Sequence, residues 1–336
     1  LKADIWFAKN RYKAESFSNV KKLVKLKNDQ GKTISCVIPT LNEGDNVGSL
    51  IKKLKSKLMD NKSRRLIDEI IVVDSGSTDN TKEAAEKAGA QFMSAQKVMK
   101  KYGNKRGKGE NLWKSLYVAK GDIIVWVDGD IKNMSPKFIY GLVGPLLTNK
   151  KLGYTKAFYQ RPLRLGRELS PLGGGRVTEL LIRPLFNMYF PKLAGFIQPL
   201  SGEYAGRREL LEKIPFFTGY GVETAMLIDI EKKFGLDVMA QVDLTKRIHR
   251  NQNLQSLSNM AFGILQVFAR RANTLGKLIQ VQKIKKTYKV IESKRDGRRI
   301  TYSFRKKEIT ESQRPPIITV PEYRKKFKKD PTWYYA

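Results

Sequence analysis

Cysteine and histidine are nearly absent from this chain of 336 residues, which contains one of each, Cys36 and His249. A single cysteine excludes an internal disulfide framework and suits a reducing compartment, so we expect a cytoplasmic protein. Zinc sites of the CxxC or HExxH kind are also excluded, and no Ser/His/Asp or Cys/His order suggests an acyl-transfer triad. Cys36 lies in the apolar run "ISCVI", which predicts a buried structural thiol.

Acidic residues and long apolar runs are scarce as well. The 65 lysines and arginines outnumber the 32 aspartates and glutamates, which gives a formal net charge of +33. Such an excess can attract nucleic acid, an anionic membrane surface or phosphorylated substrates, and composition does not choose among them. No apolar run approaches the roughly 18 residues of a membrane helix, and no signal segment opens the chain, so we expect no integral membrane association.

Strand and helix patterns alternate between residues 33 and 127. The spacing of apolar residues predicts strands at 33–38, 69–74, 90–94 and 122–127, and helices at 47–58, from about 80 to 89, and 109–119. Asn80 is the expected cap of the second helix, with Glu83 supporting the cap and Gly89 ending the helix. Apolar strands separated by helices predict an α/β fold, with a mostly parallel sheet covered on both faces.

The pattern is less regular after residue 150. Glycine-containing loops lead into predicted helices at 173–190, 200–214 and 219–235, and a long amphipathic helix is predicted at 254–280. From about Lys283 onward Lys, Arg and isolated β-branched residues dominate, with "RPPIITVPEY" as an extended stretch. We therefore expect a C-terminal helical and extended region beyond the sheet, ending in a solvated or partner-docking basic tail.

Two carboxylates end the predicted strand at 122–127, in the sequence Asp128-Gly129-Asp130. Residues two apart on an extended chain face the same way, and the glycine leaves room for a bulky group. A divalent cation that bridges a diphosphate fits this arrangement, because Mg²⁺ and Mn²⁺ take one or two carboxylates together with phosphate oxygens. Ligands bind at the carboxyl ends of parallel strands, where Asp74 and "PTLNE" also fall. A helix cap or a solvated turn is the alternative, which the residues leave open.

A basic, glycine-rich segment, "YGNKRGKGEN" at 102–111, precedes the predicted helix at 109–119. It is not a P-loop, since its glycine spacing is too short and Gly109 stands where Ser or Thr belongs. Backbone N–H groups and Lys108 can still hold phosphates there. The alternative is a solvated surface loop.

Two later segments offer further polar groups. "GGGRVTEL" at 173–180 places Arg176 and Thr178 at a predicted helix N-terminus, where they would hold an anion, unless the glycines form an interdomain hinge. His249 is flanked by Arg247 and Arg250, whose charges would keep the imidazole neutral, as a metal ligand must be. A packed or surface histidine is the alternative.

Eight motifs occur in the order typical of one family: "IPTLNE", "VVDSGSTDNT", "RGKGENLW", "VDGD", "GRVTELLIRPL", "QPLSGEYAGRRELL", "GYGVE" and "HRN". From residue 34 to about 275 the chain resembles the glucosyl-3-phosphoglycerate synthases, glycosyltransferases of the Rossmann-like GT-A fold. The resemblance implies transfer of glucose from a nucleotide-glucose, UDP- or GDP-linked, to the 2-hydroxyl of 3-phosphoglycerate. It also implies retention of the α configuration, Mg²⁺ or Mn²⁺ as cofactor, and a homodimer formed through the long helix.

The same resemblance divides the chain and assigns residues. It implies an N-terminal extension (1–30), a nucleotide-sugar-binding half (31–148), an acceptor-binding half (149–252) and a C-terminal helix with a basic tail (253–336). Donor binding falls to Pro39, Thr40, Leu41, Glu43, Ser75, Gly76, Lys108 and Asp128, and metal binding to Asp130 and His249. Acceptor binding falls to Gly175, Arg176, Thr178 and Asn251. The groups implied at the transfer step are Lys108, Glu223 and the backbone around Leu200.

Three points stay open at the level of sequence. Glu223 is the one carboxylate that could serve a double displacement, and we assign it to positioning the sugar. Gly129 departs from the family pattern, which commonly has serine between the two aspartates. A different sugar donor or acceptor, such as a mannosyl donor or a polyprenyl phosphate, is an alternative. A less favoured one is a nucleic-acid-binding protein that uses the aromatic residues of the basic tail, Tyr302, Phe304, Tyr323 and Phe327.

Overall fold

A computed structural model describes residues 2–160, 163–165, 168–170, 175–248, 253–279, 282–296 and 299–330. Its helices are α1 (Lys2–Lys9), α2 (Val20–Asp29), α3 (Gly44–Leu58), α4 (Thr81–Lys87), α5 (Lys108–Val118), α6 (Lys137–Thr148), α7 (Arg183–Tyr189), α8 (Arg208–Leu211), α9 (Val222–Phe234), α10 (Leu254–Thr274) and α11 (Pro321–Phe327). Its strands are β1 (Arg11–Lys13), β2 (Ile34–Thr40), β3 (Glu69–Asp74), β4 (Gln91–Ser94), β5 (Ile123–Trp126), β6 (Tyr154–Gln160), β7 (Leu163–Leu165), β8 (Glu168–Ser170), β9 (Tyr204–Arg207), β10 (Phe216–Phe217), β11 (Met239–Lys246), β12 (Thr287–Asp296), β13 (Arg299–Glu308) and β14 (Gln313–Arg314).

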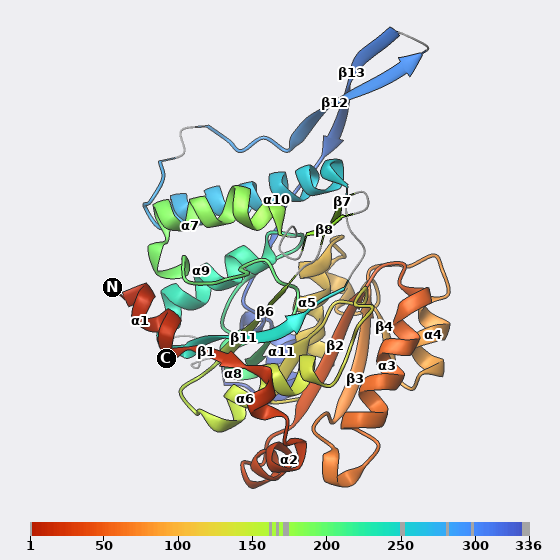
Figure 1. The fold of residues 1–336 in the computed structure, drawn as a ribbon, viewed down its shortest axis with the longest axis vertical. Helices are drawn as coiled ribbons and strands as arrows, with labels where there is room; N and C mark the ends of the chain where they lie inside the picture. Colours follow the sequence, from red (N-terminus) through yellow and green to blue (C-terminus); the bar gives the residue numbers. More distant parts are fainter. Residues whose placement is uncertain are drawn as a thin grey trace.

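The core is an 8-stranded sheet in the order β1-β11-β6-β9-β5-β2-β3-β4 (Figure 1). Strand β9 runs antiparallel to both of its neighbours, β5 and β6, and the other pairings are parallel. This confirms the predicted mostly parallel α/β sheet. The edge strand β1 and the buried Trp6 come from residues 1–30, so this segment packs on the sheet as part of the same body.

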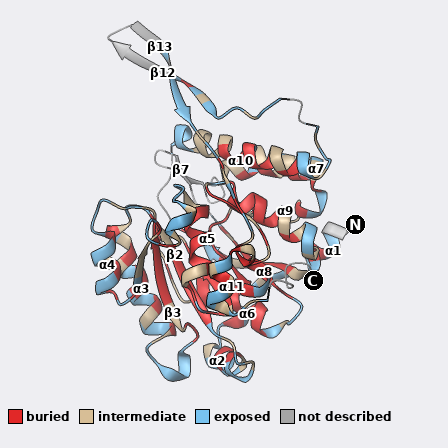
Figure 2. Ribbon diagram, turned by 180° about the vertical axis from the view of Figure 1, so that it is seen from behind, coloured by how far each residue is buried: buried red, intermediate tan, exposed pale blue. Residues whose placement is uncertain are grey.

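Both faces of the sheet are apolar because alternate residues of each strand enter different cores. In β3, Ile70 and Val72 pack in the core that holds α3 and α6, whereas Ile71 and Val73 pack in the core that holds α5 and α9. The buried residues accordingly run through the middle of the molecule, as Figure 2 shows. The thiol of Cys36 lies in the first core, where burial raises its pKa to about 12.

The strands predicted between residues 33 and 127 and the helices between them are confirmed, with ends shifted by a few residues. The cap of α4 differs from the prediction. Asn80 stands at the N-cap, but its side chain makes no cap hydrogen bond, and Asp79 accepts from the Thr81 N–H at 3.0 Å instead. Asp79 also accepts from the Gly44 N–H, so it links the start of α4 to the start of α3.

Several elements after residue 150 were not predicted from the sequence, among them the sheet strands β6, β9 and β11 and a π-helical turn. The segment predicted as a loop and helix at 200–214 contains β9, an internal strand of the sheet, before the short helix α8. The predicted helix at 173–190 begins at Arg176 but passes through a π-helical turn, Thr178–Ile182, before α7. The helices predicted at 219–235 and 254–280 are confirmed as α9 and α10.

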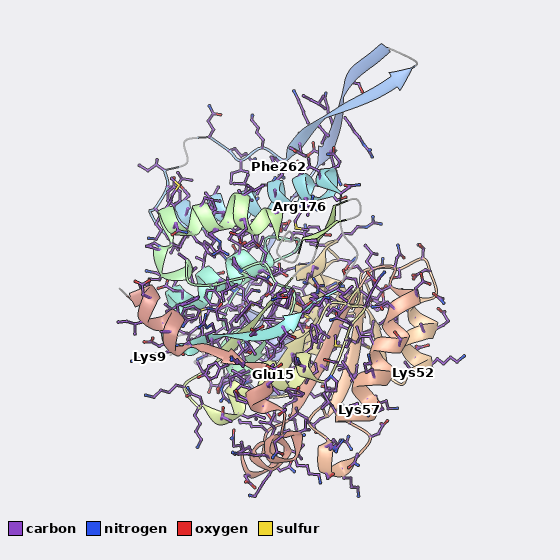
Figure 3. The ribbon with its side chains drawn as sticks, viewed as in Figure 1. Lys9, Glu15, Lys52, Lys57, Arg176 and Phe262 are labelled. Carbon is purple, nitrogen blue, oxygen red and sulfur yellow. The ribbon has the colours of Figure 1, made fainter. Side chains whose placement is uncertain are left out.

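The C-terminal region is more ordered than a solvated tail. Strands β12 and β13 form an antiparallel hairpin that projects away from the sheet beyond α10 (Figure 1). Phe262 of α10 lies at the base of this hairpin, where its ring stacks on Tyr288 at 4.9 Å (Figure 3). After the hairpin the chain returns to the body, and Tyr323 is fully buried. The expectation of a solvated tail is therefore wrong for residues 309–330. No helix in the described ranges is long and apolar enough to cross a membrane.

Candidate active site

A cavity of about 660 Å³ opens at the carboxyl ends of β2, β3 and β5. This is the position at which open parallel sheets bind ligands. Every predicted site residue within the described ranges lines it: Pro39, Thr40, Leu41, Glu43, Ser75, Gly76, Lys108, Asp128, Asp130, Gly175, Arg176, Thr178, Leu200 and Glu223. The cavity therefore joins residues that are far apart in the sequence. His249 and Asn251 lie outside the described residues.

Charged side chains meet at the centre of the cavity. The Lys108 ammonium lies 2.6 Å from Asp128 Oδ1 and 3.0 Å from Glu223 Oε1. Burial alone lowers the pKa of Lys108, but the charges of Asp128 and Glu223 outweigh it and raise that pKa above its usual value. Lys108 is therefore a permanent cation held between two carboxylates. The Tyr204 hydroxyl donates a long bond of 3.5 Å to the same Glu223 oxygen.

Arg247 is the main group that the sequence did not single out. Its Nη2 donates to Asp128 Oδ2 at 3.0 Å and to Asp130 Oδ1 at 2.8 Å. Its Nε lies 3.1 Å from Oε1 of Glu203, a fully buried carboxylate that also accepts from the Tyr159 hydroxyl. Burial raises the pKa of Glu203, although the charge of Arg247 opposes the rise. In the sequence, Arg247 appeared only as a neighbour of His249. Arg247 directly follows the last residue of β11, and the end of that strand sets the direction in which its side chain enters the site.

A glycine makes the position of Asp128 possible. A Cβ atom on Gly202 would lie 1.9 Å from Asp128 Oδ2, so a side chain there would displace the Asp128 carboxylate. At Gly129 a Cβ atom would lie 3.2 Å from Thr40 Cγ2 and 3.3 Å from Glu43 Cγ, a tight but adjustable contact. The carbonyl of Gly129 accepts from the Asn46 side chain at 2.5 Å. The turn that carries the two aspartates is therefore fixed from both sides.

The loops after β2 and β3 form one end of the cavity and are tied to each other. Asn42, which has a left-handed backbone with φ of 57°, accepts from the Thr78 N–H at 2.9 Å. Its own N–H donates to the Ser77 hydroxyl at 2.7 Å. Buried Asp74 accepts from the backbone N–H groups of Gly76 and Ser77. Asp74 thus shapes the loop but is not itself a wall of the cavity.

The opposite end of the cavity contains Arg176, Thr178 and Leu200. The segment before Leu200 is held by Gln198, whose Nε2 donates to the Tyr159 carbonyl at 2.5 Å. A second cavity of about 500 Å³ adjoins this end and shares Gly175 and Thr178 with the first. The predicted anion-binding segment therefore lies between the two spaces.

These features agree with comparisons to known proteins. The family model for glycosyl transferase family 2 matches residues 35–215, more than half of the chain. The chain belongs to glycosyl transferase family 2. The predicted GT-A fold is thereby confirmed for this family 2 glycosyltransferase.

Curated relatives extend the likeness over nearly the whole chain. Glucosyl-3-phosphoglycerate synthase of Petrotoga mobilis is 50% identical over 322 residues, which are 96% of this chain and 97% of that protein. Glucosyl-3-phosphoglycerate synthase of Mycobacterium tuberculosis H37Rv is 46% identical over 244 residues, which are 72% of this chain and 74% of that protein. The predicted resemblance to glucosyl-3-phosphoglycerate synthases is confirmed.

Solved structures show the same likeness. Mannosyl-3-phosphoglycerate synthase from Rubrobacter xylanophilus matches with a TM-score of 0.85 and 37% identity, over 94% of this chain and 99% of that chain. Glucosyl-3-phosphoglycerate synthase from M. tuberculosis, in complex with Mn²⁺, UDP and glucosyl-3-phosphoglycerate, matches with a TM-score of 0.76 and 37% identity. That match covers 89% of this chain and 95% of the other.

Several walls of the cavity in this family 2 glycosyltransferase were not assigned as site residues from the sequence. They are Asn42, Thr78, Arg106, Gly107, Asn111, Gly129, Val177, Gly202, Tyr220, Arg247, Leu257, Met260 and Ile264. Arg106 and Gly107 lay within the basic loop already singled out, and Tyr220 within "GYGVE". The three apolar residues of α10 carried no signal, because their spacing is that of any amphipathic helix.

The nucleic-acid alternative loses part of its support. Tyr323 is fully buried, and Phe327 packs on it with ring centroids 4.6 Å apart. The Tyr323 ring is therefore not open for stacking on a base, and the half-buried Phe327 ring is packed against it. The side chains of Tyr302 and Phe304 lie outside the described ones.

Proposed function

We propose that this chain transfers glucose from UDP-glucose to the 2-hydroxyl of 3-phosphoglycerate, with retention of the α configuration. The observation that carries the proposal is the single cavity that joins the residues expected to bind the donor to those expected to bind the acceptor. A half-identical relative named glucosyl-3-phosphoglycerate synthase supports it, as does a matching structure in complex with UDP-glucose and phosphoglyceric acid.

The donor would lie along the carboxyl ends of β2, β3 and β5. In this proposal Pro39, Thr40, Leu41, Glu43, Ser75 and Gly76 surround the nucleoside, and Asp128 contacts its ribose or uracil end. Lys108, the first residue of α5, contacts the diphosphate. A fixed cation and a helix N-terminus both favour the negative charge that develops on a departing nucleoside diphosphate.

The carboxylates of this site fit a divalent cation. Asp128 and Asp130 present hard oxygen ligands to the cavity, and Arg247 already supplies positive charge between them. Mg²⁺ and Mn²⁺ need only one or two protein carboxylates when phosphate oxygens complete their coordination. Asp130, together with His249, would hold the ion. When bound, the ion would neutralise charge on the leaving diphosphate.

The acceptor would enter from the opposite end of the cavity. Arg176, Thr178 and the backbone of Gly175 would hold the phosphoglycerate, with Asn251 as a further contact. The Leu200 carbonyl would accept from the 2-hydroxyl and orient it toward the anomeric carbon. Glu223 would position the sugar, since its carboxylate is already fixed by Lys108 and Tyr204.

The decisive experiment measures nucleoside diphosphate release from UDP-glucose and GDP-glucose with Mg²⁺, with and without 3-phosphoglycerate. An Asp130→Ala variant is the control. Release that requires 3-phosphoglycerate and is lost in the variant supports the proposal. Release without 3-phosphoglycerate, or none with either donor, overturns the assigned acceptor.

A second candidate differs in the sugar. The structure of mannosyl-3-phosphoglycerate synthase covers 94% of this chain with a TM-score of 0.85, which favours a mannosyl donor for the same acceptor. Running the same assay with GDP-mannose separates the two. A higher kcat/KM with GDP-mannose than with UDP-glucose would favour the mannosyl reaction.

We also propose that the active protein is a homodimer that pairs through α10. Supporting it, Leu265 of this helix is 40% exposed and Leu254 at its start is 73% exposed, which is unfavourable for large apolar side chains in water. Light scattering at micromolar concentration tests the state. A monomer, or a dimer that persists in Leu265→Lys, would contradict this interface.

A further inference from the structure

Residues 309–314 follow the β12–β13 hairpin and contribute no wall to the cavity. We call them the C-terminal strap. They contact two loops that do line the cavity, which we call the lysine loop (residues 102–110) and the tyrosine loop (residues 216–221). Arg106, Gly107 and Lys108 come from the lysine loop, and Tyr220 comes from the tyrosine loop. The tyrosine loop leads directly into α9, whose second residue is Glu223.

The two loops are in backbone contact with each other. The Glu110 N–H donates to the Thr218 carbonyl at 3.0 Å. A Cβ atom on Gly109 would lie 1.7 Å from the Phe217 carbonyl oxygen, and one on Gly107 would lie 2.5 Å from that of Thr218. Both positions therefore require glycine, and a shift of one loop moves the other.

Glu311 of the strap holds the tyrosine loop. Its carboxylate is buried and accepts from the N–H groups of Gly219 at 2.9 Å and Gly221 at 3.3 Å. A Cβ atom on Gly219 would lie 2.2 Å from Glu311 Oε1, so the glycine allows this close approach. Beside it, the Thr218 N–H donates to the Ser312 carbonyl at 2.9 Å. The strap thus satisfies the backbone of the loop that carries Tyr220.

Arg314 of the strap holds the lysine loop. Its guanidinium makes two parallel bonds to Glu110, at 2.8 Å from Nε and 2.7 Å from Nη2. Nη1 donates to the carbonyl of Tyr102 at 2.7 Å. Glu110 is fully buried in the first turn of α5, two residues after Lys108. A bidentate pair of this kind fixes direction as well as distance.

The strap is itself anchored on α10. Gln266 accepts from the Glu311 N–H at 3.2 Å and donates to the Ile309 carbonyl at 2.9 Å. Arg270 donates to the Glu311 carbonyl at 2.5 Å. The position of the strap is therefore set independently of the two loops it contacts, which a positioning element requires.

We propose that Glu311 and Arg314 are positioning residues for the transfer reaction, Glu311 acting through Tyr220 and Glu223, and Arg314 acting through Lys108. The inference rests on the proposed function for the roles of Glu223 and Lys108, whereas Tyr220 enters as a wall of the cavity. The ordering of the two loops by the strap does not depend on which substrate the protein uses.

The test uses the full chain and three variants. Glu311→Gln replaces one acceptor oxygen with an amide that faces a backbone N–H. Arg314→Met removes the bidentate pair. Lys27→Met is the matched control, because Lys27 is a buried cation bound to Asp68 at 2.8 and 2.9 Å on α2, at the end of the molecule opposite α10 (Figure 1).

For each variant we measure hydrogen exchange of the two loops and the affinity for UDP with Mg²⁺. We also measure Tm, and kcat and KM with UDP-glucose. We expect faster exchange at 216–222 in Glu311→Gln, with kcat lowered at least about tenfold and UDP affinity retained. For Arg314→Met we expect faster exchange at 102–110 and UDP affinity weakened about tenfold. Lys27→Met should lower Tm without either effect.

Unchanged exchange in both loops would overturn the proposal, as would activity losses that follow Tm equally in all three variants. If Arg314→Met does not fold, Arg314→Lys replaces it with the same measurements, because lysine keeps the positive charge but cannot make the bidentate pair with Glu110. A wild-type chain without transferase activity would refute the proposed function. The exchange and UDP measurements would still decide whether the strap orders the loops.

Discussion

Arg247 donates to Asp130 across 2.8 Å, although 117 residues separate them in the sequence. The same nitrogen bonds to Asp128, so one guanidinium neutralises both carboxylates that follow β5. A third carboxylate, Glu203, lies behind it without exposure to solvent. The turn after β5 can hold two like charges because a cation is built in beside them.

Replacing Arg247 with methionine tests this balance. We expect the free energy of unfolding to fall by about 3–5 kcal/mol, because Asp128, Asp130 and the buried Glu203 would lose the cation that they share. In the proposed function Mn²⁺ would supply positive charge at the same carboxylates, so it should raise the Tm of the variant more than that of the wild type. Thermal unfolding with and without Mn²⁺ checks this. An equal Mn²⁺ shift in both proteins would contradict the expected balance.

Lys108 offers a test of catalytic charge. Lys108→Met should lower kcat/KM by roughly 10²–10³, the usual effect of removing one fixed group that stabilises developing charge. Lys105→Met is the control, since Lys105 is an exposed lysine of the same loop that does not line the cavity. Steady-state kinetics with both substrates measures the difference. Similar losses in the two variants would indicate a general effect of loop charge.

Two glycines near Asp128 should respond differently to an added methyl group. Gly202→Ala must displace the Asp128 carboxylate, because the new Cβ atom would lie 1.9 Å from its Oδ2. Gly129→Ala requires shifts of only a few tenths of an ångström. We expect a kcat/KM loss of about 10²-fold for the first and less than about tenfold for the second. A severe loss in Gly129→Ala would show that the turn tolerates no side chain at all.

Lys156 gives a prediction about pH. Its ammonium is fully buried and donates to the Ser201 carbonyl at 2.8 Å, next to the segment that carries Leu200. Burial lowers the pKa of Lys156 to about 7, with the charge of Glu223 opposing and that of Lys108 adding to the shift. Between that value and the ordinary 10.5 the unfolded chain binds more protons than the folded chain, so this group adds stability as the pH rises.

Urea unfolding of the wild type and Lys156→Met at several pH values checks the sign. The free energy of unfolding of the wild type, relative to the variant, should increase from about pH 7 to about pH 9, by at most about 1.4 kcal/mol per pH unit. A relative stability that stays constant over this range would mean that Lys156 stays charged in the folded protein.

Much of the sheet could be predicted because its strands carry their signal locally. In β2, β3 and β5 nearly every residue is apolar and buried, which is the pattern of a sheet covered on both faces. Strand β9 escaped prediction because its four residues precede a helical pattern without a break. Only pairing with β5 and β6 makes that segment a strand.

Site residues could be predicted where a motif directly follows a strand. They could not be predicted where contacts with distant segments set the direction of the side chain. Asp128 and Asp130 follow β5, so their position comes with the strand. The inward direction of Arg247 depends on three carboxylates from other segments, which local sequence does not display. The family resemblance supplied many of the residues that line the cavity, but it stopped near residue 275 and gave no reason to examine Glu311 or Arg314.

The strap also has a consequence for how the chain is made. Among the described residues, Ile264 is the last one to line the cavity, yet Arg314 reaches Glu110 across 204 residues of sequence. During synthesis these cavity residues leave the ribosome before the strap that orders the lysine and tyrosine loops. Activity should therefore appear late and all at once. A chain clipped between β13 and Glu311 would keep those cavity residues and still be a poor enzyme.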